Sequence, residues 1–171
     1  MKASALLLAL TLLLTAGCGY HAPGAGDAWV GQQGRTLYVE LFANRTVEPY
    51  LDSVVTEEVA IQLSRSRLTE LVEDRNGADL LLGGTVTNFA SNAAAYDASD
   101  DISEYSAYMT VKARLIRKGD GKVLWQEDFS RSQTYPALAN KSAQQEGESL
   151  AARVLSRRIA EDIYARLLAA F

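Results

Sequence analysis

The sequence contains very few of the side chains that enzymes use for nucleophilic, acid–base or metal chemistry. Among its 171 residues there is one cysteine, Cys18, and one histidine, His21. A single imidazole on its own builds neither a metal cluster nor a hydrolytic triad, and no serine stands in a nucleophile elbow. The composition therefore predicts a protein that is not an enzyme and that carries no cofactor and no metal.

Basic residues and long apolar runs are also in short supply. The chain has 17 Lys and Arg against 21 Asp and Glu, so we expect no basic face for nucleic acid. The most apolar stretch, residues 3–14, is shorter than the roughly 20 residues that a membrane-spanning helix needs. Two classes of function, nucleic-acid binding and membrane spanning by a helix, are thereby disfavoured.

That apolar stretch belongs to a pattern typical of an export signal. Lys2 provides a positive start, residues 3–14 are apolar apart from Ser4 and Thr11, and small residues then lead to Cys18. A positive start, a short apolar core and a small-residue exit together define a secretory signal. We expect a lipoprotein signal peptide over residues 1–17; the alternative is a buried hydrophobic helix.

The lone cysteine resembles the lipid acceptor of a lipobox, since it directly follows Ala16 and Gly17. Thr15 departs from the Leu that most lipoboxes carry at that position. Gly19, rather than Asp, follows the cysteine, which by resemblance to enterobacterial sorting implies the outer membrane. We therefore expect Cys18 to be the lipid attachment site, anchoring the chain in the inner leaflet of the outer membrane so that its body faces the periplasm. Each buried methylene contributes about 0.8 kcal/mol to such an anchor.

The rest of the chain divides into a lipidated N-terminal tether and one domain. Residues 18–35 hold five glycines and few aliphatic side chains, which is typical of a flexible tether. Residues 36–171 match the size of a single α+β domain. Its expected elements, from alternation and four-residue periodicity, are strand 36–42, helix 49–67, strand 69–73, strand 78–90, strand 105–115, strand 122–135 and a helix from about residue 142 to the C-terminus.

These elements predict a two-layer α+β sandwich, with a mainly antiparallel or mixed sheet of about four strands and two helices packed on one face. Gly83-Gly84 interrupts a strand and indicates a bulge or a close backbone approach. Trp125 is expected in the core together with Val123 and Phe129. The acidic residues of segment 91–102 indicate an exposed loop; a calcium site is the less favoured interpretation, because the EF-hand spacing is absent.

Basic residues gather around one predicted hairpin turn, at Gly119-Asp120-Gly121. The set comprises Lys112, Arg114, Arg117, Lys118 and Lys122. Such a group suits phosphates or acidic partner loops. Strands also carry Lys and Arg on their wet face without any ligand, and this second interpretation stays open.

Several motifs occur in an order and spacing that resemble the LPS-assembly lipoprotein family (LptE). They are Cys-Gly-Tyr-His at 18–21, Phe-Ala-Asn-Arg-Thr-Val-Glu-Pro at 42–49, Ala-Asp-Leu-Leu-Leu-Gly-Gly at 78–84 and Gly-Lys-Val-Leu-Trp at 121–125. The resemblance spans nearly the whole chain after residue 17. The strand–Asn-Arg-Thr–helix pattern also occurs in other periplasmic α+β lipoproteins, and the Cys-Gly-Tyr-His start favours this family.

The resemblance implies a protein that plugs a large outer-membrane β-barrel, the lipopolysaccharide translocon, helps the barrel to assemble and contacts lipopolysaccharide during its insertion. The partners it implies are the barrel, lipopolysaccharide and the inner leaflet of the outer membrane. By position, Arg114, Lys118 and Lys122 are the candidate lipopolysaccharide contacts. The alternative is an outer-membrane lipoprotein that activates or scaffolds a periplasmic cell-wall enzyme. A calcium-dependent carbohydrate hydrolase built on the acidic loop is a third and weaker alternative.

Overall fold

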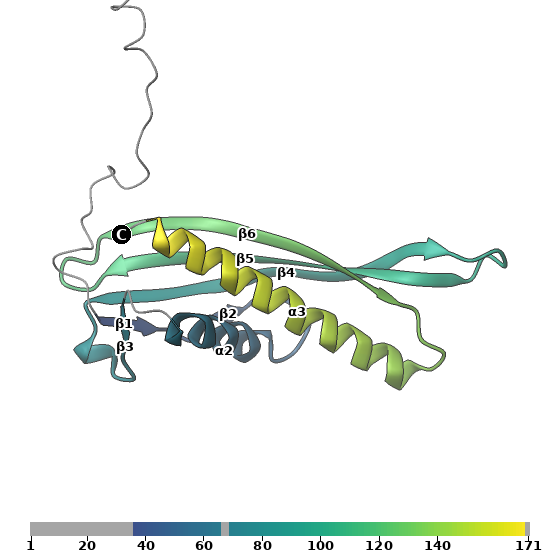
Figure 1. Ribbon diagram of the computed structural model, residues 1–171, viewed down its shortest axis with the longest axis horizontal. Helices are drawn as coiled ribbons and strands as arrows, with labels where there is room; N and C mark the ends of the chain where they lie inside the picture. Colours follow the sequence, from purple (N-terminus) through teal and green to yellow (C-terminus); the bar gives the residue numbers. More distant parts are fainter. Residues whose placement is uncertain (1–35, 66–68, 170–171) are drawn as a thin grey trace, which may run out of the picture.

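A six-stranded mixed sheet forms one layer of the molecule and two helices form the other (Figure 1). The computed structural model describes residues 36–65 and 69–169. The elements, in chain order, are β1 (Thr36–Val39), β2 (Ala43–Asn44), α2 (Leu51–Ser64), β3 (Glu70–Leu71), the short 3-10 helix η1 (Arg75–Gly77), β4 (Leu80–Tyr96), β5 (Ile102–Arg117), β6 (Val123–Pro136) and α3 (Lys141–Leu168). This confirms the predicted α+β sandwich. The predicted signal, Cys18 and the tether lie outside the described residues, as does the expected helix end near Arg67.

The sheet order is β3-β1-β4-β5-β6, and β2 extends the line of β1 along β4. The β1, β2 and β3 pairings are parallel, whereas β4, β5 and β6 form an antiparallel meander. The five predicted strand segments correspond to β1, β3, β4, β5 and β6, and the two-residue strand β2 is additional. The sheet therefore has six strands where about four were expected. The alternation of inward and outward side chains shifts by one residue between β1 and β2. Phe42 is buried in the core and Leu41 is exposed, the reverse of what the alternation from Leu37 predicts.

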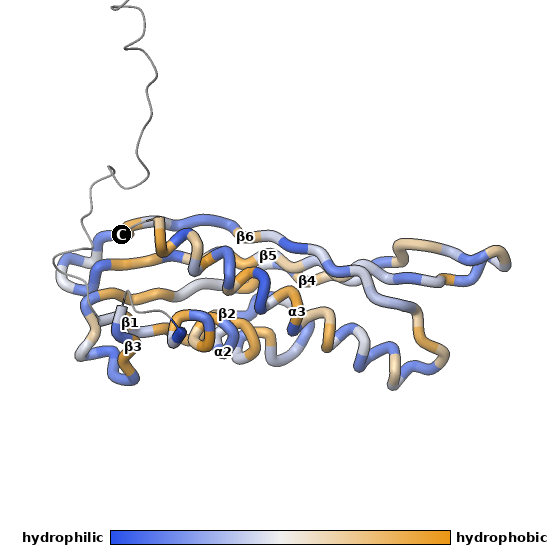
Figure 2. Tube along the Cα trace, in the orientation of Figure 1, coloured by the Kyte–Doolittle hydropathy of each residue, from blue (hydrophilic) through white to orange (hydrophobic). Residues whose placement is uncertain are grey.

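The core lies between the inner face of the sheet and the two helices. On β5, every second residue from Ala107 to Leu115 is fully buried, as the alternation predicts. The buried stripes of the helices are also those expected from four-residue spacing: Leu51, Val55, Val59 and Leu63 on α2, and Ala151, Leu155, Ile159, Ile163 and Leu167 on α3. Figure 2 shows these hydrophobic positions alternating with hydrophilic ones along both helices.

The expectation of a loop over 91–102 is wrong. β4 continues to Tyr96 and β5 begins at Ile102, so only residues 97–101 turn the chain. The side chain of Asp97 holds this turn by accepting hydrogen bonds from the backbone N–H groups of Ser99 (2.8 Å) and Asp101 (3.1 Å). The small residues after Ala90 have a weak intrinsic preference for strands. They form part of β4 because they pair with β5, and such pairing outweighs intrinsic propensity.

The inward position expected for Val123 is also wrong, since its side chain is 50% exposed. Leu115 pairs with Trp125 and Ile116 with Val123, so Leu124 is an extra residue that forms a bulge in β6. A bulge shifts the alternation by one position. Trp125 itself is buried as expected, and Phe129 is partly buried against it.

The sequence left open whether Gly83 and Gly84 mark a bulge or a close approach of another part of the chain to their backbone. They pair regularly with Arg114 and Ala113, so no bulge occurs there. A Cβ built on Gly84 would collide with the backbone carbonyl of Lys112 and would lie 2.7 Å from the ring of Phe42. Gly84 is therefore required by close packing.

Candidate functional site

The predicted basic group lies at the end of the β5–β6 hairpin. Arg114 is on the outer face of β5, the face away from the helices, where it is exposed beside Gly83 and Gln126. Lys118 and Lys122 flank the turn at residues 119–121, in which Gly121 adopts a positive φ of 69°. The structure thus brings Lys118 and Lys122 to one turn and places Arg114 farther along the strand.

Several of the neighbouring charges are neutralised locally. Arg117 pairs with Asp120 at 3.2 Å, and Lys112 pairs with Asp128 at 3.7 Å. The backbone N–H of Lys122, followed by the charge of Arg117, lowers the pKa of Asp120 despite some opposing desolvation. This keeps a negative charge inside the turn and reduces the positive potential there.

Of the three candidate contact residues, one is partly engaged within the protein. The ammonium of Lys118 donates to the backbone carbonyl of Asn76 in η1. Within the described part of the chain, Arg114 and Lys122 form no ion pair. Arg114 and Lys122 are therefore the cations most available to an anionic ligand.

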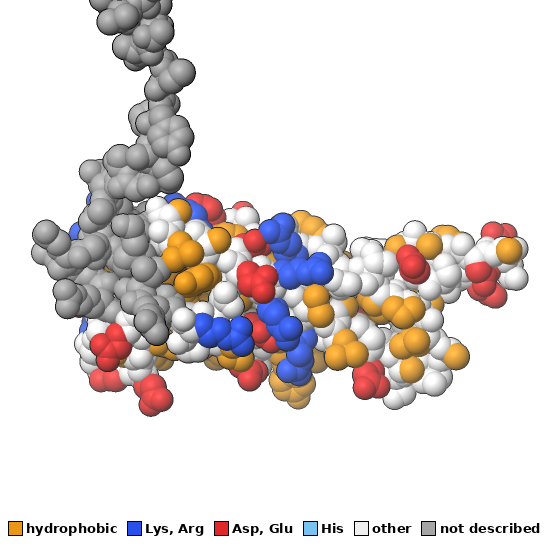
Figure 3. Space-filling model, viewed as in Figure 1, with side chains coloured by type: hydrophobic (Ala, Val, Ile, Leu, Met, Phe, Trp, Pro, Cys, Tyr) orange, Lys and Arg blue, Asp and Glu red, His pale blue; other side chains and the backbone are white. Residues whose placement is uncertain are grey.

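A second basic group lies on the helix-covered side, where Figure 3 shows Lys and Arg side chains in a band across the middle of the molecule. Arg157 of α3 pairs with Glu58 of α2 at 3.5 Å, and Arg131 of β6 pairs with Asp162 of α3. These two arginines join elements within the domain. Sequence reasoning did not single out the band, although Arg153 and Arg157, four residues apart on one helix, were a readable signal.

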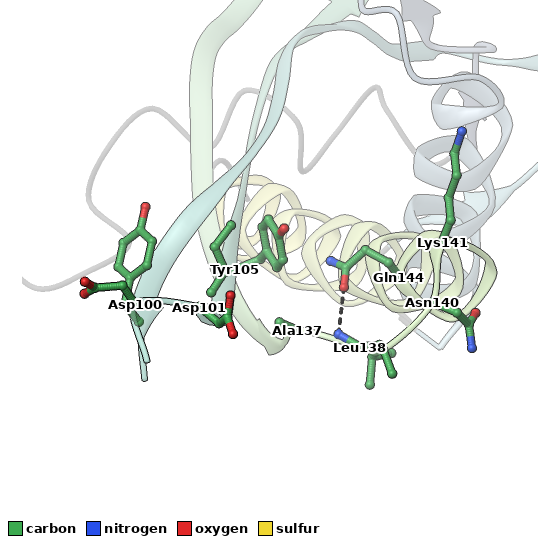
Figure 4. A pocket seen from close by; sticks show the side chains of 11 residues that line it. Asp100, Asp101, Tyr105, Ala137, Leu138, Asn140, Lys141 and Gln144 are labelled. Carbon is green, nitrogen blue, oxygen red and sulfur yellow. Dashed lines mark hydrogen bonds between the residues drawn. The ribbon is translucent and has the colours of Figure 1, made fainter. Parts of the chain in front are cut away.

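A hollow of about 840 Å³ opens at the far end of the molecule, between the β4–β5 turn and the start of α3 (Figure 4). Tyr105 lies in it from the sheet and stacks on Tyr135, with ring centroids 5.8 Å apart. Gln144 reaches in from α3 and accepts a hydrogen bond from the backbone N–H of Leu138 at 2.9 Å. Sequence reasoning missed this hollow because it depends on the extension of β4 and β5 beyond the expected loop.

The hollow combines aromatic and polar groups without a catalytic arrangement. Figure 4 shows the carboxylates of Asp100 and Asp101 on one side and the ammonium of Lys141 on the opposite side. Across residues 36–65 and 69–169, no three His, Cys, Asp or Glu side chains are grouped so as to hold a metal ion. No described helix combines the length and apolarity needed to cross a membrane.

A groove of about 500 Å³ separates the start of α2 from α3 and is lined by Glu48, Tyr50 and Glu148, among others. Partial burial raises the pKa of Glu148, and repulsion from Glu48 adds to that rise. Tyr50 is 76% exposed and adopts a left-handed φ of 64° at the helix start. Asn44 fixes the preceding loop: its amide donates to the carbonyl of Glu48 (2.7 Å) and its carbonyl accepts from the N–H of Thr46 (2.9 Å).

The fold defines a class, the small α+β domain in which two helices cover one face of an open mixed sheet. Within that class the chain belongs to the lipopolysaccharide-assembly family LptE, whose family model matches residues 34–167. The resemblance noted from the sequence is thereby confirmed, and the chain is assigned to a family of lipopolysaccharide-assembly lipoproteins. No curated protein matches the chain significantly.

Solved structures show the same fold at low sequence identity. A protein from Xanthomonas campestris is 13% identical with a TM-score of 0.58, covering 81% of this chain and 88% of its own. Rare lipoprotein B from Shewanella oneidensis is 13% identical with a TM-score of 0.53, covering 78% and 93%. A minor lipoprotein from Acinetobacter baumannii is 16% identical with a TM-score of 0.53, covering 80% and 92%. At these identities the likeness establishes the fold.

Proposed function

We propose that this protein is an outer-membrane lipoprotein that plugs the β-barrel lipopolysaccharide translocon, helps it to assemble and contacts lipopolysaccharide as it passes. The observation that carries the proposal is the family match over residues 34–167, nearly the whole described domain. A barrel wide enough for such a cargo leaks unless its lumen is filled. A domain of two packed layers, a sheet and two helices, is suited to fill that lumen.

Lipopolysaccharide contact is assigned to Arg114, Lys118 and Lys122. Phosphate groups attract exposed guanidinium and ammonium groups through charge-assisted hydrogen bonds. Arg114 and Lys122 form no ion pair within the described residues, which supports their availability. The Asn76 carbonyl already uses one of the three N–H donors of Lys118 and holds its side chain toward η1, so we expect Lys118 to contribute least.

The barrel partnership is tested by purifying the tagged, full-length lipoprotein from detergent-solubilised outer membranes. We expect a one-to-one complex with a large β-barrel. Recovery of the lipoprotein alone would contradict the proposal. Recovery with a cell-wall synthase would replace it with the alternative function as an enzyme activator.

The lipid contact is tested by charge reversal of Arg114, Lys118 and Lys122 to Glu. Binding of lipopolysaccharide to the purified complex should weaken, most strongly at low salt, where charges are least screened. The matched control reverses Arg65, Lys141 and Arg153, which are exposed on the helix-covered side. An equal loss in both triple variants would show a non-specific charge effect and would remove the assignment.

A further inference from the structure

One edge of β4 is covered by other strands along only part of its length. β5 pairs with β4 from end to end, but on the opposite edge β1 reaches only Leu80–Leu82 and β2 only Thr85–Val86. The last backbone hydrogen bond on this edge runs from the N–H of Arg45 to the carbonyl of Val86. Beyond it, no strand among the described residues pairs with Thr87–Tyr96 on this edge, opposite β5.

The uncovered edge lacks the charged and proline residues that normally prevent strand addition. Residues 87–96, Thr-Asn-Phe-Ala-Ser-Asn-Ala-Ala-Ala-Tyr, contain no charged residue, no proline and no glycine. Natural sheets place such residues on their edges because unpaired N–H and C=O groups recruit other strands. Bulges occur near both ends of the segment, while Asn88–Ala93 between them pairs in regular register with β5. Asn88–Ala93 is therefore a regular six-residue stretch of strand whose edge opposite β5 is not paired with any strand of the described residues.

The other long edge of the same sheet, β6, is protected. It carries charges on its inner face, where Glu127 pairs with Arg166 and Arg131 with Asp162. It also contains the bulge at Leu124 and ends at Pro136. The β4 edge has bulges only at the ends of the segment and carries neither charges nor proline between them, so the bare edge of β4 is expected to be covered in the working protein.

The bare edge is rigid and accessible. Ser91 is tied to β6 by a 2.7 Å hydrogen bond between its hydroxyl and that of Tyr135, and Phe89 packs partly against the core. Most side chains between Asn88 and Ala95 are small, including Ala90 and Ala93, which permits close approach of another backbone. Figure 1 shows this part of β4 beyond α2, toward the end of the molecule opposite β1.

We propose that the Thr87–Tyr96 edge of β4 binds an extended, uncharged segment of the barrel partner by strand addition. The inference rests on the function proposed above and specifies how the partner is held. Backbone hydrogen bonds would supply affinity, and the absence of charge on the edge favours a segment that is uncharged as well. A second copy fits less well, because an antiparallel pair of β4 edges would place the two β1 ends, and with them two membrane anchors, at opposite ends of a long assembly.

The test introduces a photo-reactive amino acid at Asn92, on the bare edge, in the tagged full-length lipoprotein in cells. The matched control carries the same residue at Gln126, which is exposed on the protected strand β6. We expect position 92 to cross-link to one extended segment of the barrel and position 126 not to cross-link to that segment. Cross-linking of position 92 to a second copy, or cross-linking of both positions to the same barrel segment, would overturn the inference.

A proline scan provides an independent measurement. Because successive N–H groups of a strand point to opposite sides, one of Ala90→Pro and Ser91→Pro removes an outward N–H and leaves the β5 pairing intact. The variant that keeps the wild-type melting temperature should recover about tenfold less barrel, since it loses a backbone hydrogen bond and blocks close approach. Undiminished recovery would refute strand addition, while failure of the wild-type protein to recover any barrel would refute the proposed function itself.

Discussion

At the scale of single residues, Trp125 is the best test of the core. Its side chain is 5% exposed, it meets Phe129 edge-on at 6.2 Å, and the guanidinium of Arg166 lies 5.5 Å above its ring. Its indole N–H is buried and has no hydrogen-bond partner within the described residues. An unpaired buried donor costs stability, so the ring's packing must outweigh that cost.

We predict that Trp125→Ala lowers the free energy of unfolding by about 3–5 kcal/mol, a large share of a domain's total. Trp125→Phe should cost less, because it keeps an aromatic ring and removes the unpaired N–H. Urea denaturation of the three proteins measures both differences. An unchanged midpoint for the alanine variant would show that the residue does not support the core.

Two adjacent glycines offer a second residue-scale comparison. Gly84→Ala places a methyl group against the carbonyl of Lys112, which is fixed in the sheet, so we predict a loss of about 1–3 kcal/mol from overpacking. Gly83→Ala meets mainly the carboxylate end of Glu40, at 2.8 Å, which can move. The stability of this control variant, Gly83→Ala, should remain within about 1 kcal/mol of wild type. The alanine restricts the unfolded chain, which partly compensates for any strain in the folded state. Equal melting temperatures for the two variants would contradict the close approach.

At the scale of elements, the junction of α2 and α3 should respond to pH through Glu148. Its pKa is raised in the folded protein by partial burial and by Glu48, so the folded state holds the proton more tightly than the unfolded state. Folding stability due to this group is therefore unaffected below the ordinary carboxyl pKa and falls as the pH rises through the raised value.

We predict that Glu148→Gln raises the melting temperature at pH 7 and that the gain shrinks as the pH is lowered through the carboxyl range. Glu146→Gln, an exposed position on the same helix, is the control and should change little. Melting curves between pH 4 and pH 7 provide the measurement. A gain that stays constant with pH would show that ionisation of Glu148 is not its source.

The elements also show what a sequence can predict and what it cannot. Both helices and the inner face of β5 follow from periodicity, because their side chains meet a continuous core. The extension of β4 to Tyr96 does not, since Ala93 and its neighbours have little strand preference and become a strand only by pairing with β5. The outward turn of Val123 depends on one bulge at Leu124, for which residue types give no warning. The hollow beside Tyr105 could not be predicted for the first of these reasons, because it forms only once β4 and β5 are extended.

At the scale of the whole molecule, the membrane anchor remains a prediction that rests on Cys18. We expect Cys18→Ala to abolish lipid attachment and to leave an uncleaved or mislocalised precursor. Metabolic labelling with a fatty-acid probe, followed by membrane fractionation, measures this. Thr15→Leu, which restores the residue common in lipoboxes, should label at least as well as wild type. Equal labelling of the alanine variant would show that the cysteine is not the acceptor.

The parallel pairing of β1 has a consequence for the order in which the chain folds. Leu37 pairs with Leu80, 43 positions later in the chain, whereas β4, β5 and β6 each pair with the strand that follows or precedes them through a short turn. Closing a long loop costs more chain entropy than closing a short one. In the export that the predicted signal peptide implies, the N-terminus emerges first, so we expect the first strand to arrive to be among the last to find its neighbour. The domain would then close only after the meander behind it has formed.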